Sequence, residues 1–169
     1  MTQRDAEIVT AFLLGNLEME VPVTLGVFGA VLDGGLDYRP DPVSKTALGL
    51  LRHITLEDEW FLEAIVEGRF GAPPDESDAC GIRGPADAAA RYRERVPALI
   101  ARVRALPGEA LVREIDLFGM VKLPAVQFLS MVLRHSAHHR GQLSAYLRAM
   151  GGKVPAIYGP SADTVSATA

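Results

Sequence analysis

Apolar residues recur every three or four positions in four long segments of this 169-residue chain, which is the period of one face of an α-helix. The third segment shows it best, with intervals of 4, 3, 4 and 3 through Tyr92, Val96, Leu99, Val103 and Leu106. Such intervals are typical of a helix that packs nearly antiparallel against others. Nothing in the sequence indicates a ladder of strands. We therefore predict an all-α fold, a four-helix bundle.

Glycine, proline and capping residues set the expected limits of the four helices. The predicted ranges are residues 5–32, residues 44–67 with Ser44 as N-cap, a third helix from Pro85, and a fourth from Pro124 to Gly151 and Gly152. The first helix has its apolar stripe through Ile8, Phe12, Leu17, Leu25, Phe28 and Leu32. Residues 1–160 should then form a single domain. The extended C-terminal tail that follows, residues 161–169, is expected to be flexible.

The segment between the third and fourth helices, residues 107–123, has no clear period and is predicted to be short and irregular. Its central part, Leu111 to Leu117, is compatible with a short strand, an extended loop or a fragment of helix. The sequence leaves these three interpretations open.

Composition excludes several classes of protein. The formal net charge is −4, and acidic and basic residues are interspersed, so no positive face is expected for binding nucleic acid. No apolar run approaches the roughly 20 residues of a membrane span, and the charged start is unlike a signal peptide. The single cysteine, Cys80, cannot form an internal disulfide. We therefore expect a cytoplasmic protein without a nucleic-acid or membrane partner.

Three of the four histidines fall in the run HSAHH, residues 135–139. Residues i and i+4 of a helix lie about 40° apart, so His135 and His139 should project side by side. This spacing allows two imidazoles to bind one metal ion, whereas His138 points elsewhere. Ser136 stands where an HExxH zinc protease needs its glutamate, which argues against that mechanism.

A third ligand is expected from a facing helix, and His53, midway along the second helix, is the remaining histidine. Three histidines would leave coordination positions open, as in a catalytic site. The simpler interpretation is that these histidines are hydrogen-bonded polar residues of a bundle. Against it, His135 and His139 share their stripe with Phe128 and Val132, and burying each imidazole without a partner would cost about 1–3 kcal/mol. Spacing alone leaves both interpretations open.

Two longer stretches resemble a known family. The run HSAHHRGQLSAYLRAMGGKVPAIYGPSAD, residues 135–163, resembles the C-terminal signature of the DinB-like family, the DNA-damage-inducible four-helix metal proteins. The stretch LDYRPDPVSKTALGLLRHITLEDEWFLEAI, residues 36–65, is similar to that family's second-helix segment. The resemblance implies a homodimer in which His53, His135 and His139 bind a divalent metal ion. Zn²⁺ or Ni²⁺ is expected first, with Fe²⁺, Cu²⁺ or Mn²⁺ as alternatives.

The same resemblance implies a class of reaction. Relatives in the wider superfamily include S-transferases and isomerases that use a low-molecular-weight thiol, so we expect a metal-dependent thiol S-transferase or hydrolase acting on a small electrophile. The alternative is a non-catalytic protein in which the ion only ties the second and fourth helices together. An open coordination position facing a cavity favours the enzyme, and a fourth protein ligand, which would have to be a carboxylate, favours the structural ion.

Other side chains are candidates for supporting roles. Glu57, one turn after the second-helix histidine, and Gln142, on the histidine stripe, are candidate partners of the metal ligands. Arg140 could orient an anionic substrate or pair with a carboxylate within the fold. Tyr158 and Asp163 could cover the site or simply pack the C-terminus. The aromatic Trp60 is expected in the core or lining a pocket near the metal.

Overall fold

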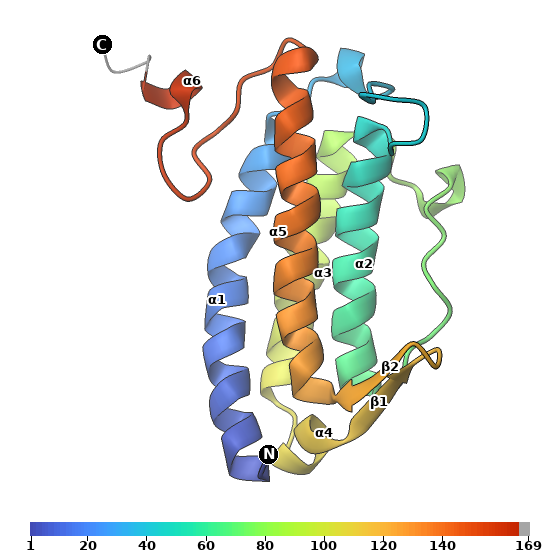
Figure 1. The fold of residues 1–169 in the computed structure, drawn as a ribbon, viewed down its shortest axis with the longest axis vertical. Helices are drawn as coiled ribbons and strands as arrows, with labels where there is room; N and C mark the ends of the chain where they lie inside the picture. The colour runs from blue at the N-terminus through green and yellow to red at the C-terminus, as the bar shows by residue number, and fades with distance from the viewer. Residues whose placement is uncertain (166–169) are drawn as a thin grey trace.

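In the computed structural model, which describes residues 1–165, four long helices run side by side as a bundle (Figure 1). They are α1 (Gln3–Gly29), α2 (Ala47–Glu67), α3 (Pro85–Arg104) and α5 (Ala125–Ala149). The shorter elements are the 3₁₀ turns η1 (Asp33–Gly35) and η2 (Asp78–Cys80), the helices α4 (Gly108–Val112) and α6 (Ala162–Val165), and the strands β1 (Glu114–Leu117) and β2 (Val121–Pro124). The predicted all-α, four-helix bundle is confirmed.

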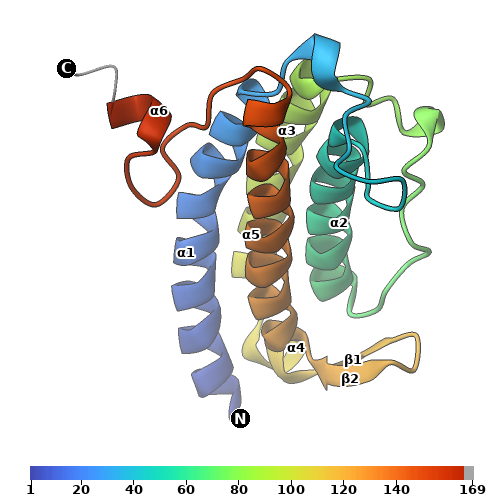
Figure 2. The ribbon, with the colours of Figure 1, turned by 45° about the horizontal axis from the view of Figure 1, so that its top comes forward.

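The four helices enclose one core, because α1 and α2 each pack against both α3 and α5. The predicted stripe of α3 is buried from Tyr92 to Val103. The predicted stripe of α2 is also buried, at Leu50, Ile54, Phe61 and Ile65. Helix α5 lies between α1 and α2 in both views (Figures 1 and 2), and its contact with α2 brings together the two helices that carry the histidines.

Helix α1 has two apolar faces, and the predicted stripe was partly wrong. Ile8 and Phe12, expected in the core, are 57% and 70% exposed. The buried face runs instead through Ala6, Thr10, Leu14 and Leu17. Contrary to the sequence-based expectation, α1 is long and apolar enough to cross a membrane by length and composition alone. In this fold it packs against α3, α4 and α5 as a helix of the bundle.

Helix α2 begins two residues later than predicted. Thr46 rather than Ser44 is its N-cap, and the Thr46 hydroxyl accepts a hydrogen bond from the backbone N–H of Gly49 (3.0 Å). Ser44 instead donates its hydroxyl to the Asp41 carboxylate (2.6 Å) in the preceding turn. Both residues are common N-caps, so local sequence could not choose between them. The helix ends at Glu67 as predicted.

The undecided segment before α5 forms one short helix and a β-hairpin at the end of the bundle (Figure 1). Strands β1 and β2 pair antiparallel, with Leu117 opposite Val121. Ile115 and Leu117 are buried on one face of the hairpin. No strand ladder was predicted here, because four-residue strands are too short to show an alternating pattern.

The chain after α5 crosses to the α1 side of the bundle, away from α2 (Figure 2). There Asp163 accepts hydrogen bonds from the Val154 backbone N–H (2.9 Å) and from Arg148 (3.1 Å). Ser161 donates its hydroxyl to the Val154 carbonyl (2.5 Å). The expected flexibility of residues 161–169 stays a prediction, and residues 166–169 lie outside the described part of the chain.

Candidate metal centre

The structure brings His53, His135 and His139 together between α2 and α5, and we call these three residues the histidine centre. The Nε2 atom of His53 lies 3.1 Å from Nε2 of His139 and 3.2 Å from Nε2 of His135. His138, predicted to lie outside the site, is exposed on α5 and is not part of this group. All three predicted ligands therefore converge on one point.

The spacing of the Nε2 atoms fits a shared metal ion. Bonds of about 2.0–2.1 Å separated by 90–110° place two nitrogen ligands about 2.9–3.4 Å apart. The observed separations of 3.1 Å and 3.2 Å fall within that range. The residues present therefore fit a divalent ion bound by three imidazoles.

The opposite ring nitrogen of each histidine faces an oxygen atom. The Nδ1 atom of His53 lies 2.5 Å from Glu76 Oε1, that of His135 lies 3.2 Å from Asp58 Oδ1, and that of His139 lies 2.7 Å from Gln142 Oε1. Carboxylate and amide oxygens can only accept, so these contacts favour the tautomer in which Nδ1 carries the proton, and in a neutral ring of that form Nε2 holds a lone pair. Three lone pairs aimed at one point repel one another unless a cation lies between them, which is the arrangement of metal-bound histidines with supporting hydrogen bonds.

The ligand His139 is held in its neutral form. Burial lowers its pKa to about 4, further helped by the neighbouring His135 and His53 and only partly opposed by the hydrogen bond with Gln142. A neutral imidazole at physiological pH is the form that binds a metal ion, because the protonated ring has no free lone pair.

Carboxylates surround the histidine centre on the α2 side. Asp58 is fully buried and accepts a hydrogen bond from the Tyr92 hydroxyl (2.8 Å) in addition to its contact with His135. Burial opposes the charge on Glu76, but hydrogen bonds with His53 and Lys45 outweigh it and lower its pKa to about 2. The fully buried Asp58 needs a compensating positive charge, and a divalent ion at the centre would supply it. The half-buried Glu76 already has one in Lys45 (2.6 Å).

Glu76 reaches the centre from the loop between α2 and α3, which is tied down by the buried Arg52. This guanidinium donates to the carbonyls of Ile82 (2.8 Å) and Glu76 (3.2 Å) and to the carboxylate of Asp78 (2.6 Å). Lys45 adds an ion pair with Glu76 (2.6 Å). The position of this loop is therefore what holds the partner of His53.

The sequence missed two of the three supporting residues. Gln142 was predicted as a partner of the ligands and does contact His139. Asp58 was not predicted, although a run of three acids, residues 57–59, within an apolar helix was a usable signal. Glu76 lies in a loop without periodicity, where sequence offered no signal. Glu57, the other predicted partner, has a carboxylate oxygen within 4.8 Å of the donor atoms of His53 and Glu76, and burial raises its pKa.

An open pocket of about 320 Å³ borders the histidine centre on its α5 side. His135 and His139 line it together with Phe61, Met131, Arg134 and His138. Trp60, considered as a pocket residue near the metal, lines a different hollow beside Glu63 and Gly71 and donates a hydrogen bond to the Gly71 carbonyl (3.2 Å). The centre is therefore accessible from one side to a small molecule.

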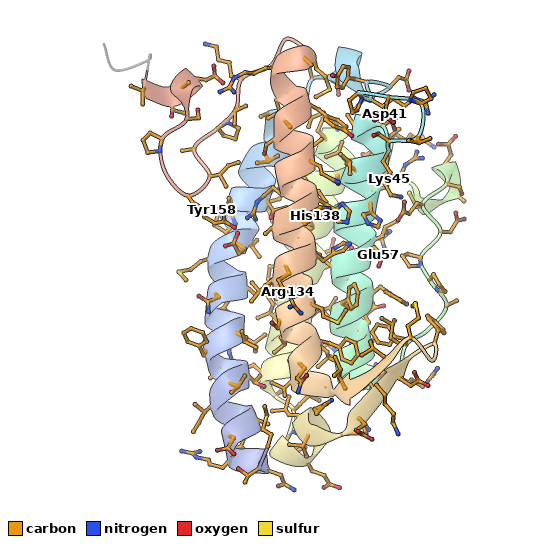
Figure 3. All side chains as sticks on the ribbon, viewed as in Figure 1. Asp41, Lys45, Glu57, Arg134, His138 and Tyr158 are labelled. Atoms are coloured by element: carbon orange, nitrogen blue, oxygen red, sulfur yellow. The ribbon has the colours of Figure 1, made fainter. Side chains whose placement is uncertain are left out.

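Arg140 points away from the centre and pairs with a carboxylate, one of its two predicted roles. Its side chain is buried and contacts Glu20 on α1 (2.5 Å), the Thr24 hydroxyl (3.0 Å) and the Tyr158 hydroxyl. Tyr158 lies on this α1 side of the bundle, whereas Glu57 lies on α2 (Figure 3). Tyr158 and Asp163 therefore pack the C-terminus and do not cover the site.

Comparisons with known proteins point to one family. The sequence profile of the DinB family matches residues 14–167. The uncharacterized protein YjoA of Bacillus subtilis (strain 168) is 32% identical over 118 residues, which cover 68% of this chain and 73% of that protein.

Two solved structures have a similar fold. The crystal structure of the DinB-like protein YjoA from Bacillus subtilis has a TM-score of 0.66 at 24% identity, covering 90% of this chain and 97% of that one. A DinB-like protein from Bacillus cereus ATCC 10987 has a TM-score of 0.73 at 22% identity, covering 86% and 95%. At these identities the likeness concerns the fold alone.

Proposed function

Because this chain belongs to the DinB family, we propose that its histidine centre binds a divalent metal ion and transfers a low-molecular-weight thiol to a small electrophile. The observation that carries this proposal is the convergence of three Nε2 lone pairs beside an open pocket. A bound ion would supply a Lewis acid that lowers the pKa of a thiol or a water molecule. We place this chemistry in the cytoplasm, where small thiols and the free Cys80 stay reduced.

The side chains around the centre would have different roles in thiol transfer. The histidines would hold the ion, and Asp58, Glu76 and Gln142 would fix the orientation of their rings through the contacts with Nδ1. Glu57, whose carboxylate lies within 4.8 Å of a ring nitrogen of His53, would accept the proton that leaves the thiol. The sulfur would then form its new bond to the electrophilic carbon, and the leaving group would depart with the electron pair of the broken bond.

A non-catalytic metal protein is the alternative, and it requires a fourth protein ligand. Glu76 is already engaged by His53 and Lys45, which leaves Glu57 as the nearest candidate. The pocket beside His135 and His139 favours the enzyme, because it gives a small molecule access to the ion.

Visible absorption of the Co²⁺-loaded protein separates the two proposals. Addition of 2-mercaptoethanol is expected to change the bands of the bound Co²⁺ in a saturable way, because a sulfur ligand enters an open position. The Glu57→Gln variant serves as the control for a fourth ligand and should start from the same spectrum as the parent protein. A parent spectrum that no thiol changes, together with an altered starting spectrum in Glu57→Gln, would establish a closed structural ion.

We also propose that the chain forms a homodimer through the exposed face of α1. Ile8, Phe12, Gly15 and Met19 follow intervals of 4, 3 and 4 along that face, the pattern of a helix–helix seam. Ile8, Phe12 and Met19 are 57%, 70% and 64% exposed. A second copy would bury this stripe and remove its apolar surface from water.

Light scattering on eluting protein should therefore give twice the chain mass of 18.2 kDa. A Phe12→Glu variant should shift the protein to the monomer while keeping the helical fold, which circular dichroism checks, since the side chain is exposed. Met120→Glu is the matched control, because Met120 is 73% exposed on the hairpin and should leave the dimer intact. A monomeric parent protein, or a dimer unaffected by Phe12→Glu, would refute this interface.

A further inference from the structure

We propose that Arg134 binds a carboxylate on the thiol that enters the metal pocket, so that the substrate carries a negative charge beyond its sulfur. This inference rests on the proposed thiol chemistry and names the class of thiol. It follows from the position of Arg134, from the absence of an ion pair with it in the described part of the chain, and from the distribution of charge around the pocket.

Arg134 lies at the mouth of the pocket and is partly immobilised. It directly precedes the predicted ligand His135 on α5, and both residues line the pocket. Figure 3 shows the position of Arg134 on α5. Its Nε donates to the Ser130 carbonyl (3.1 Å), which leaves the two terminal NH₂ groups of the guanidinium for another acceptor. A planar pair of donors of this kind matches a carboxylate.

No carboxylate within residues 1–165 forms an ion pair with Arg134. Arg91 and Arg140 differ, since they pair with Glu59 (2.8 Å) and Glu20 (2.5 Å). Arg93 on α3 also forms no ion pair within the described residues, but only Arg134 of these two lines the pocket. A cation without an internal partner beside a candidate active site is free to recognise a ligand.

The charges around the pocket are segregated by helix. The acidic groups Glu57, Asp58 and Glu76 come from α2 and the following loop, and Lys45 pairs with one of them, Glu76 (2.6 Å). Arg134, the cation that lines the pocket, belongs to α5 (Figure 3). If the sulfur of a thiol lies at the histidine centre, the carboxylates on the α2 side would therefore repel a second negative charge on that thiol. On the α5 side the Arg134 guanidinium would attract it.

The remaining walls define the body of the ligand. Phe61 and Met131 are the apolar lining residues, and the volume of about 320 Å³ suits a small molecule. A flat apolar group between the sulfur and the carboxylate would contact these side chains. The probe with these properties is 4-mercaptobenzoate, whose rigid ring prevents its carboxylate from reaching the same metal ion as its sulfur.

The test compares 4-mercaptobenzoate with its uncharged isostere 4-mercaptobenzamide, each titrated into Co²⁺-loaded protein and followed by visible absorption. The parent protein is expected to bind the acid about tenfold more tightly than the amide. In an Arg134→Gln variant the preference should fall to about one, with binding of the amide unchanged. Arg93→Gln removes an equal charge from the exposed side of α3, which does not line the pocket, and should keep the preference.

The outcomes separate this inference from the proposed function. If neither thiol changes the spectrum, the thiol chemistry is wrong and the role of Arg134 is lost with it. If both thiols bind but the preference is equal in the parent protein and in Arg134→Gln, the thiol chemistry stands and the role of Arg134 is wrong. An Arg134→Lys variant controls for a loss of folding in Arg134→Gln. It should retain a reduced preference for the acid over the amide, because it keeps the charge without the planar pair of donors.

Discussion

Untagged protein that never meets a nickel column is expected to carry about one divalent ion per chain, and its His139→Ala variant is expected to carry none. His139 supplies one of three Nε2 atoms, and the two remaining imidazoles are too few to hold the ion. Elemental mass spectrometry of both proteins gives the ion content and identifies the metal. The effect on stability should be equally clear, because an ion at about 100 times its Kd adds about 2.7 kcal/mol to the free energy of unfolding.

The neighbouring histidine provides the control for that experiment. His138→Ala removes the same kind of side chain from the preceding position of α5. His138 is exposed and outside the histidine centre, so this variant should leave the ion content unchanged. A parent protein that contains no metal and takes up none when Zn²⁺, Ni²⁺, Fe²⁺ or Mn²⁺ is offered would leave the three histidines as polar residues of the bundle. It would also remove the basis for the enzymatic proposal.

The second large effect is expected for the buried cation on the other side of α5. Arg140→Met should lower the free energy of unfolding of the metal-free protein by about 3 kcal/mol, because it removes the charged partner of Glu20 and leaves only the hydrogen bond from the Tyr158 hydroxyl (3.0 Å). Arg140 is 1% exposed, and its guanidinium joins α5 to α1 and to Tyr158 in the C-terminal segment. Urea unfolding followed by circular dichroism measures the change.

Two further variants decide whether the loss comes from the unpaired charge. Combining Arg140→Met with Glu20→Gln should recover part of the stability, since no charge then stays unpaired. Arg148→Met removes a more exposed ion pair with Asp163 and should cost clearly less than Arg140→Met, because solvent screens the pair. Equal losses for Arg140→Met and Arg148→Met would show that burial of the first pair contributes nothing.

The long helices were predictable because each has one apolar face of regular period. The limits of that reasoning appear in α1, which has a second apolar face. Ile8 and Phe12 on that face were predicted to be buried, but both are exposed. Periodicity identifies an apolar face but not which neighbour covers it. The hairpin of β1 and β2 escaped prediction for a different reason, because each strand has four residues, too few to establish an alternating pattern.

The histidine centre was predictable from residue type, spacing and resemblance, whereas its supporting residues were not. His135 and His139 share a helix face, so their proximity follows from the helix alone. The contacts of Asp58 with His135 and of Glu76 with His53 link positions 77 and 23 residues apart, and only the packing of α5 and the loop on α2 creates them. The path of the chain after α5 was equally unpredictable, and Tyr158 contacts Glu20 on α1.

The centre joins positions that are distant in the chain, with His53 and His139 separated by 86 residues. An ion bound by both therefore acts as a reversible crosslink that closes a loop of about half the protein. Such a link can form only after α2 and α5 have met, so it stabilises the completed bundle and not its early folding intermediates. Chelation would then remove one link between α2 and α5, and occupancy of the metal would help to determine how long the fold persists.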